Sequence, residues 1–337
     1  MAMRNKIYLL VIIILLHITS LVQAEIKIGI IGLDTSHALA FSELLNGDKN
    51  TEYQDFRIVA AYPYGSKTIK SSYDRIPAYI EGVKKCGVEI VPSISELLKK
   101  VDCVMLETND GNLHLEQALE VFKAGKIMFI DKPIAASLVH AIAIFDLAKK
   151  YNVPIFSSSP LRYSPQTQKL AKGELGNVFA ADCFSPHREE PSHPDFGWYG
   201  IHGVEILYTV MGTGCVSVNR MTSKDADVVV GLWNDGRIGT FRGLQKGAPI
   251  YGGTAFTTDK GAVQVGGYGG YEPLLDQILT FFKTRVAPVS EKETLEIFTF
   301  MESSNVSVKQ NGKIISMDET YQKAQKEAKK ILKKLKE

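Results

Sequence analysis

The chain has 337 residues, which is enough for one large or two medium domains with hydrophobic cores of their own. Its formal net charge is +2, and loss of the first 24 residues, which carry Arg4 and Lys6 but no acid, would bring that charge to zero. A neutral protein lacks the basic surface that nucleic-acid binding needs, so we expect no nucleic-acid partner.

Residues 1–24 have the pattern of a secretory signal peptide. A short basic start precedes the apolar run 7–18, and the small-residue end at 22–24 predicts cleavage before Glu25. The apolar run is shorter than the roughly 20 residues of a membrane span. We therefore expect an exported, periplasmic protein with no stable membrane span after cleavage; an uncleaved anchor is the alternative.

The first half of the mature chain alternates short apolar runs with helix-like patterns. Helical spacing is found at 113–124 and 135–149, and apolar runs occur at residues 26–31, 56–62, 88–91, 103–106, 127–130 and 154–156. Near-continuous apolar strands separated by helices are typical of a parallel sheet covered on both faces. The pattern predicts a Rossmann-like, doubly wound α/β domain over residues 25–156.

The second half, residues 157–337, follows a different pattern. Alternating strands are expected at 178–185, 215–221, 227–233 and 237–244, with turns at 234–236 and 258–261. Helices are expected at 164–171, 202–211, 272–284 and 292–307, and a lysine-rich amphipathic helix at the C-terminus. These elements predict an α+β domain with an open, mainly antiparallel sheet.

The four cysteines, Cys86, Cys103, Cys183 and Cys215, are widely spaced and form no CxxC motif. An exported protein could oxidise a pair of them, and the sequence leaves three pairings open. We expect buried free thiols.

The loop after the first strand departs from the dinucleotide-binding pattern G-x-G-x-x-G. At the three glycine positions of that pattern the chain has Gly32, Asp34 and His37, so only the first glycine is present. Contact between this loop and a cofactor phosphate at the following helix N-terminus is one interpretation. The other is plain helix capping, since Asp34, Thr35 and Ser36 are all favourable N-cap residues.

The second strand ends at Tyr62, where NAD-binding folds usually carry an acidic residue for the ribose. Ser66 and Lys67 lie just beyond it and are candidates for holding a 2′-phosphate, or are ordinary loop residues. The sequence therefore leaves NAD and NADP both open.

Further along the chain, residues 107–110 are followed by His114, then by Asp131-Lys132-Pro133 and Arg162-Tyr163. This order resembles the Gfo/Idh/MocA oxidoreductases over nearly the whole mature chain. In that family a Glu-Lys-Pro tripeptide supplies a lysine that contacts the substrate hydroxyl and the nicotinamide ribose. The resemblance implies that Lys132 is catalytic and that the cofactor contacts include Thr108, Asn109, His114, Asp131, Lys132 and Arg162.

The family's second-domain motif D-x-G-x-H-x-x-D is matched at Gly200, His202 and Glu205, while Trp198 stands at its first Asp. Oxidation of a sugar carbinol needs a base for the hydroxyl proton, and the resemblance gives His202 that role beside Lys132. The structural alternatives are that Lys132 only pairs with Asp131 or Glu107 and that His202 caps its helix.

Several polar and aromatic residues fall in one window before and within that helix. A sugar site with aromatic walls is expected from this cluster, whose candidate substrate contacts are His187, His193, Trp198, Tyr199, His202 and Glu205. The histidine spacing matches no standard zinc pattern, so no metal site is predicted.

The resemblance implies an NAD(P)-dependent oxidoreductase acting on a sugar or polyol, and a homo-oligomer. Free nicotinamide cofactor is not expected outside the cytoplasm, so the cofactor would have to stay bound. Two alternatives remain: a cofactor-independent sugar epimerase, lyase or hydrolase, and a non-catalytic periplasmic carbohydrate-binding protein.

Overall fold

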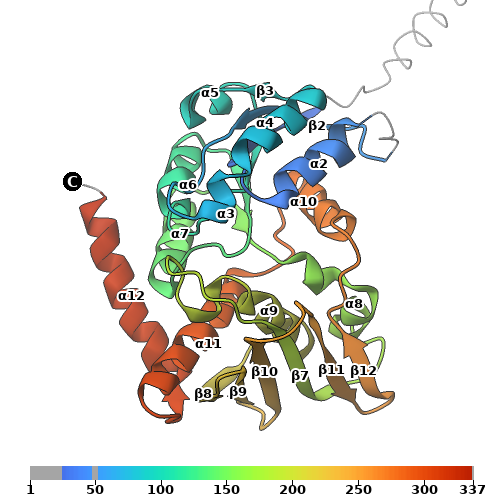
Figure 1. The fold of residues 1–337 in the computed structure, drawn as a ribbon, viewed down its shortest axis with the longest axis vertical. Coiled ribbons are helices and arrows are strands. Elements are labelled where there is room, and N and C mark those ends of the chain that lie inside the picture. Colours follow the sequence, from blue (N-terminus) through green and yellow to red (C-terminus); the bar gives the residue numbers. More distant parts are fainter. Residues whose placement is uncertain (1–24, 48–51, 336–337) are drawn as a thin grey trace, which may run out of the picture.

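The computed structural model describes residues 25–47 and 52–335 (Figure 1). The predicted signal peptide, residues 1–24, lies outside the described residues. None of the helices within the described ranges is long and apolar enough to cross a membrane.

The first domain is built on a six-stranded parallel sheet, as the apolar runs predicted. The strands, in spatial order, are β3 (Glu89–Ile90), β2 (Phe56–Tyr62), β1 (Ile26–Ile31), β4 (Cys103–Leu106), β5 (Ile127–Ile130) and β6 (Ile155–Phe156). All pairs are parallel, and β1 lies between β2 and β4. The strand order reverses at β1, so a crevice opens at the carboxyl ends of β1 and β4, where doubly wound folds bind their ligands.

Helices cover both faces of this sheet. One face carries α5 (Ile94–Leu98), α6 (His114–Lys123) and α7 (Leu138–Lys150), and their apolar residues share a core with Val104 and Ile130. The other face is covered by α2 (Ser36–Asn46) and α4 (Ile76–Lys85), and the short α3 (Lys70–Tyr73) precedes α4. The side-chain hydroxyls of Ser93 and Ser137 cap the N-termini of α5 and α7, which fixes where those helices begin.

The second domain is built on a seven-stranded sheet. Its strands, in spatial order, are β12 (Gly261–Val265), β11 (Gly252–Thr257), β7 (Val178–Pro186), β10 (Ile238–Leu244), β9 (Ala226–Trp233), β8 (Cys215–Thr222) and β13 (Ile315–Ser316). Only β7 and β10 pair in parallel. The expected turns join β9 to β10 and β11 to β12, and Gly236 and Gly261 adopt the positive φ that these turns require. The predicted fold class is confirmed.

A buried helix, α9 (Gly200–Met211), lies on one face of this sheet, and every one of its residues is buried. A Cβ on Gly203 would come within 2.5 Å of the Phe241 ring, so glycine lets the helix approach β10 closely. The remaining elements are α8 (Pro165–Ala171), α10 (Glu272–Thr284), α11 (Glu291–Lys309), α12 (Met317–Lys334) and two 3₁₀ turns, η1 (Pro160–Tyr163) and η2 (Asp195–Gly197). The close approach of α9 to β10 at Gly203 sets the distance between the sheet and the side chains of α9.

The boundary expected at residue 157 needs one correction. Helix α10 follows the strands of the second sheet, but Leu275, Ile278 and Phe281 pack into the core of the first domain beside α2 (Figure 1). An amphipathic helix packs against the surface that best covers its apolar face, and the position of the helix in the sequence does not reveal which surface that is.

The C-terminal helix and the cysteines are as expected. In α12, Ala324 and Ala328 are buried while lysines such as Lys326 are exposed, which gives an amphipathic helix with a solvated basic face. All four cysteines are free thiols; Cys86 is half-buried and the other three are buried.

Candidate active site

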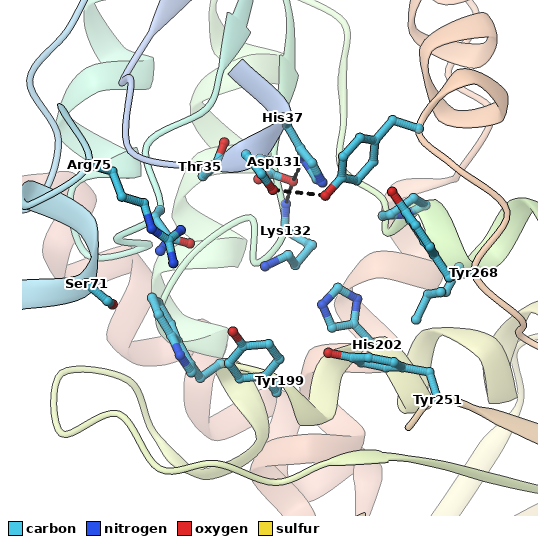
Figure 2. Close-up of a pocket in the computed structure, with 16 residues that line it drawn as sticks. Thr35, His37, Ser71, Arg75, Asp131, Lys132, Tyr199, His202, Tyr251 and Tyr268 are labelled. Carbon is cyan, nitrogen blue, oxygen red and sulfur yellow. Dashed lines mark hydrogen bonds and ion pairs between the residues drawn. The ribbon is translucent and has the colours of Figure 1, made fainter. Parts of the chain in front are cut away.

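A cavity of about 430 Å³ lies between the carboxyl edge of the first sheet and α9 (Figure 2). Three groups of residues form its walls. The loops after β1, β4 and β5 supply Thr35, Ser36, His37, Asn109, Asp131 and Lys132; the segment around α3 supplies Ser71 and Arg75; the rest of the chain supplies Pro160, Leu161, Trp198, Tyr199, His202, Tyr251, Tyr268 and Tyr271. The cavity therefore occupies the ligand position of a doubly wound fold.

The turn after β1 keeps the one glycine that its geometry requires. Gly32 has φ +90°, and a Cβ there would lie 2.5 Å from the Thr108 amide nitrogen. Helix α2 then begins at Ser36 and receives no side-chain cap from Thr35. The interpretation of this loop as a plain helix cap is therefore wrong, because no side chain bonds to the helix N-terminus. The first residues of α2 line the cavity, where their amides can meet an anionic group.

Asp34 is fully buried and turned away from the helix. Its two carboxylate oxygens accept hydrogen bonds from the backbone amides of Asn109, at 2.9 Å, and Ser66, at 3.2 Å. Burial raises the pKa of Asp34 to about 6, in spite of these hydrogen bonds. Asp34 thus ties together the loops after β1, β2 and β4, and its charge does not face the α2 N-terminus.

His37 reaches from the first turn of α2 to two buried carboxylates at the ends of β4 and β5. Its Nδ1 lies 3.1 Å from Asp131 Oδ1 and 3.6 Å from Glu107 Oε2. Burial alone would lower the pKa of His37, but Asp131 and Glu107 raise it to about 10. Burial raises the pKa of Glu107 to about 7, whereas for Asp131 the cations His37 and Lys132 outweigh burial and lower the pKa.

Lys132 is half-buried and lies in the cavity wall beside this cluster (Figure 2). Its backbone amide donates to Asp131 Oδ1 at 2.7 Å, which holds the Lys132 backbone beside the Asp131 carboxylate. Among the described residues its ammonium forms no ion pair, so the alternative that Lys132 merely pairs with Asp131 or Glu107 is wrong. The ammonium is available to a ligand oxygen.

His202 faces Lys132 from α9 on the far side of the cavity (Figure 2). Its Nδ1 lies 2.7 Å from Ser159 Oγ, which leaves Nε2 for a ligand. Burial, with a further contribution from the charge of Lys132, lowers the pKa of His202 well below its ordinary value. His202 is the third residue of α9 and bonds to Ser159, so it does not act as a cap; it is a neutral imidazole that can accept a proton.

Aromatic side chains close the cavity. Tyr251 meets the His202 ring edge-on at 5.4 Å between centroids, and the Tyr271 hydroxyl lies 2.9 Å from Ser36 Oγ. Flat rings beside polar groups suit a ligand with apolar ring faces and hydroxyl edges, as a sugar has.

Three comparisons with known proteins bear on this arrangement. Residues 26–158 match the family described as the Gfo/Idh/MocA oxidoreductase family with an NAD-binding Rossmann fold. This match covers the first domain of the chain. A curated relative from Streptococcus pneumoniae, described as an uncharacterized oxidoreductase, is 25% identical over 142 residues, which span 40% of this chain and 38% of that protein.

Solved structures share the fold of the whole described chain. A probable dehydrogenase from Thermotoga maritima superposes with a TM-score of 0.70 at 17% identity, over 88% of this chain and 100% of that one. A scyllo-inositol dehydrogenase from Lactobacillus casei, solved with bound NAD(H) and scyllo-inositol, gives 0.69 at 14% identity, over 87% and 99%. Both domains therefore share the fold of these two structures.

Of the residues expected from the sequence to contact the cofactor, some line the cavity and others support it from behind. Thr35, Ser36, His37, Asn109, Asp131 and Lys132 line it. Tyr62, Thr108, His114 and Arg162 do not: the ring nitrogens of His114 lie 2.6 Å from Thr108 O and 3.1 Å from Ile134 O, and Arg162 pairs with Glu205 and Glu293. Thr108, His114 and Arg162 are buried and hold the loops that carry the lining residues, whereas Tyr62 is half-buried and packs against the Tyr64 ring.

Three of the expected substrate contacts also lie outside the cavity wall. Glu205 accepts from Arg162 Nε at 2.8 Å and from the Ser159 amide, beneath His202. His193 Nε2 accepts from the Gly111 amide at 3.0 Å, and His187 is bonded to Asp195 and Asp227 in the second domain. Trp198, Tyr199 and His202 are in the wall as expected.

Sequence reasoning missed Ser71, Arg75, Tyr251, Tyr268 and Tyr271. One signal was present: Tyr268 and Tyr271 alternate with paired glycines in the segment 266–271, which is unusual for a solvent-exposed loop. Ser66 and Lys67 are not part of the cavity wall, and the Ser66 hydroxyl accepts from the Thr68 and Ile69 amides, so a 2′-phosphate contact there stays a prediction.

Proposed function

We propose that the protein is an exported NAD(P)-dependent oxidoreductase that keeps its cofactor bound and acts on a sugar or polyol. The observation that carries the proposal is the pair formed by an unpaired Lys132 and a neutral His202, which face one cavity at an uncapped helix N-terminus. The NAD-binding family of the first domain and the inositol dehydrogenase among the similar structures support it.

The residues present fit a dinucleotide. The Asp34 carboxylate is bonded to the amides of Asn109 and Ser66, and no side chain caps α2, so the backbone amides of its first turn are available to the pyrophosphate. Arg75 and Ser71 line the same side of the cavity as Thr35 and would meet anionic or hydroxyl groups of the cofactor (Figure 2). When bound, the nicotinamide accepts hydride from a carbinol or returns it.

The protein's own groups handle the oxygen and its proton. With the proton of His202 on Nδ1 and directed to Ser159, Nε2 takes the proton of the substrate hydroxyl. The ammonium of Lys132 donates to the same oxygen and stabilises the charge that develops on it. The rings of Trp198, Tyr199 and Tyr251 hold the sugar ring and keep water away from the reacting carbon.

A cofactor-independent reaction is the second candidate, and one observation favours it. The second strand ends at Tyr62 without the acidic residue that usually binds the ribose of NAD. In that case Lys132 and His202 would act as acid and base in an epimerase, lyase or hydrolase. A non-catalytic carbohydrate-binding protein would use the same cavity without turnover.

The test is to purify residues 25–337, denature the protein and identify any released nucleotide by mass and absorbance. We expect stoichiometric NAD(H) or NADP(H), followed by hydride transfer to or from an inositol or aldose in a substrate panel. Absence of nucleotide, together with failure of added NADH and NADPH to bind, would refute the oxidoreductase proposal and leave the cofactor-independent candidates.

Assembly as a homo-oligomer belongs to the same proposal. Leu232 and Ile238 pair across β9 and β10 and are 42% and 50% exposed, which gives the outer face of the second sheet an apolar patch that a second copy would cover. Light scattering coupled to size exclusion measures this directly, and a monomer at micromolar concentration would contradict it.

A further inference from the structure

The cluster of His37, Glu107 and Asp131 has more ligand atoms than its own contacts use. One atom from each side chain lies within 4.8 Å of the other two, and the three residues are 5%, 0% and 1% exposed. His37 Nδ1, Glu107 Oε1 and Asp131 Oδ2 have no hydrogen-bond partner among the described residues. Buried polar atoms are nearly always paired, so three unpaired atoms, one on each member of this group, call for a ligand.

The charges lead to the same conclusion. Two carboxylates are buried side by side, and neither forms an ion pair with a lysine or arginine among the described residues, so a bound cation would stabilise both. The short distances between His37 and the carboxylates lack hydrogen-bond geometry. Ligand atoms brought together around one point, without bonding one another, are what a coordinated cation requires.

We propose that His37, Glu107 and Asp131 bind one divalent transition-metal ion in the wall of the cavity beside Lys132. An imidazole nitrogen with two carboxylate oxygens suits Mn²⁺, Fe²⁺ or Zn²⁺ better than Mg²⁺ or Ca²⁺, which prefer oxygen ligands alone. Three protein ligands leave coordination positions open, and His37 and Asp131 both line the cavity.

Neighbouring groups hold the ligands in place, as outer-shell contacts do in metal sites. The Thr35 hydroxyl donates to Glu107 Oε2 at 3.5 Å, and the Lys132 amide donates to Asp131 Oδ1 at 2.7 Å. The Tyr271 ring packs edge-on against His37 at 4.6 Å between centroids. If the proposed function is right, the open positions would take hydroxyl or carbonyl oxygens of the substrate beside Lys132; binding of the ion itself does not depend on that function.

The experiment uses the whole mature chain, residues 25–337, stripped with EDTA and titrated with Mn²⁺ and separately with Zn²⁺. We expect one ion per chain, and pulsed electron paramagnetic resonance of the Mn²⁺ form should show coupling to a single imidazole nitrogen. Glu107→Gln and His37→Ala should weaken binding by more than the roughly 10–100-fold that loss of an outer-shell partner costs.

His140→Gln is the matched control, because His140 Nδ1 is also buried without a hydrogen-bond partner but is not part of the group of ligand atoms. It should bind the ion with wild-type affinity. Thermal unfolding of each variant checks that the variants are folded, and the imidazole coupling of the wild-type protein tests the site even where a variant does not fold.

Three results would overturn the proposal: no binding by the wild-type chain, no imidazole coupling in its Mn²⁺ form, or unchanged affinity in folded Glu107→Gln and His37→Ala. The first would mean that His37 only holds a proton between the carboxylates. Titration of the stripped protein with NADH separates failure of the metal site from failure of the proposed function. NADH binding without metal binding would refute only the metal site, and metal binding without NADH binding would refute only the redox function.

Discussion

One buried cluster of histidine and two carboxylates lies in each domain, and the two clusters differ in how well their atoms are paired. In the second domain, His187 lies 2.7 Å from Asp227 and 3.1 Å from Asp195. Arg220 binds both of these aspartates, and Thr222 and Gln245 donate to Asp227. In the first domain, His37 faces Glu107 and Asp131, and no lysine or arginine among the described residues pairs with either acid. Three of its side-chain atoms lack a hydrogen-bond partner, against one, His187 Nε2, in the second domain's cluster.

The two clusters also differ in what surrounds them. The His187 cluster lies outside the cavity and anchors the loop that precedes α9, which carries Trp198 and Tyr199. The His37 cluster is part of the cavity wall. Acids that are bound by Arg220 and further donors away from the cavity mark a cluster that stabilises the fold, whereas acids with free atoms at a cavity mark one that interacts with a ligand.

The largest effect on stability is expected from Asp227→Ala. Asp227 is fully buried and accepts from Arg220, Thr222 and Gln245, so its removal leaves the buried Arg220 and His187 without their main counter-charge. We expect a loss of about 3–5 kcal/mol in the free energy of unfolding, measured by urea denaturation. Asp225→Ala, which removes an exposed partner of Lys246 at 3.8 Å, should cost less than about 1 kcal/mol. Equal losses in the two variants would contradict a structural role for the paired cluster.

The reverse behaviour is expected beside the unpaired cluster, at Lys132. Lys132→Met should reduce turnover by roughly 10²–10⁴-fold, because the group that stabilises the reacting oxygen is lost. Its free energy of unfolding should change by less than about 0.5 kcal/mol, since the ammonium forms no ion pair within the described part of the chain. Lys126→Met, at another half-buried lysine, is the control and should keep wild-type turnover. A Lys132→Met variant with unchanged turnover would exclude Lys132 from the chemistry.

The pH dependence of stability tests the His187 cluster more finely. Burial lowers the pKa of His187, but Asp195 and Asp227 raise it overall to about 9 from 6.5. The folded protein therefore holds this proton more tightly than the unfolded chain, so the stabilisation is complete below about pH 6.5 and is lost as the pH rises through about 9.

Wild type should therefore exceed His187→Gln in free energy of unfolding by roughly 2 kcal/mol more at pH 7 than at pH 10. Urea denaturation of both proteins at the two pH values measures this difference. The His140→Gln variant should show no such change over the same interval, because burial lowers the pKa of His140 and the ring is already neutral. A difference that is flat with pH would mean that His187 is neutral in the folded protein.

Much of the fold could be predicted from the sequence because its strongest patterns are local. Strands such as β1 and β5 are uninterrupted apolar runs, and their observed ends match the expected ones. Strand β11 was missed because Gly252, Gly253 and Thr254 give it little apolar signal; its pairing with β7 supplies what the sequence pattern does not. The position of α10 was missed because its partner lies far away in sequence.

The site was less predictable because it is assembled from loops. Lys132 and His202 could be found, since a motif carried each of them, whereas Arg75 and Tyr251 come from segments without periodicity. The grouping of His37, Glu107 and Asp131 follows from strand order, since β1, β4 and β5 are neighbours whose carboxyl ends meet at one edge. Single-sequence patterns give the strands but not that order.

The smallest effect is expected at the rim of the cavity, where Arg75 is exposed and forms no ion pair among the described residues. Arg75→Gln should weaken NADH or NADPH binding by roughly 5–10-fold, about 1 kcal/mol, because a solvated arginine adds one charge-assisted contact to a phosphate group. Fluorescence titration measures it, and Arg57→Gln, at an exposed arginine on β2 outside the cavity, should bind as wild type does. A larger loss of affinity for NADPH than for NADH would assign Arg75 to the 2′-phosphate, and equal losses would assign it to the pyrophosphate. Unchanged affinity for both would place the dinucleotide away from this side of the cavity.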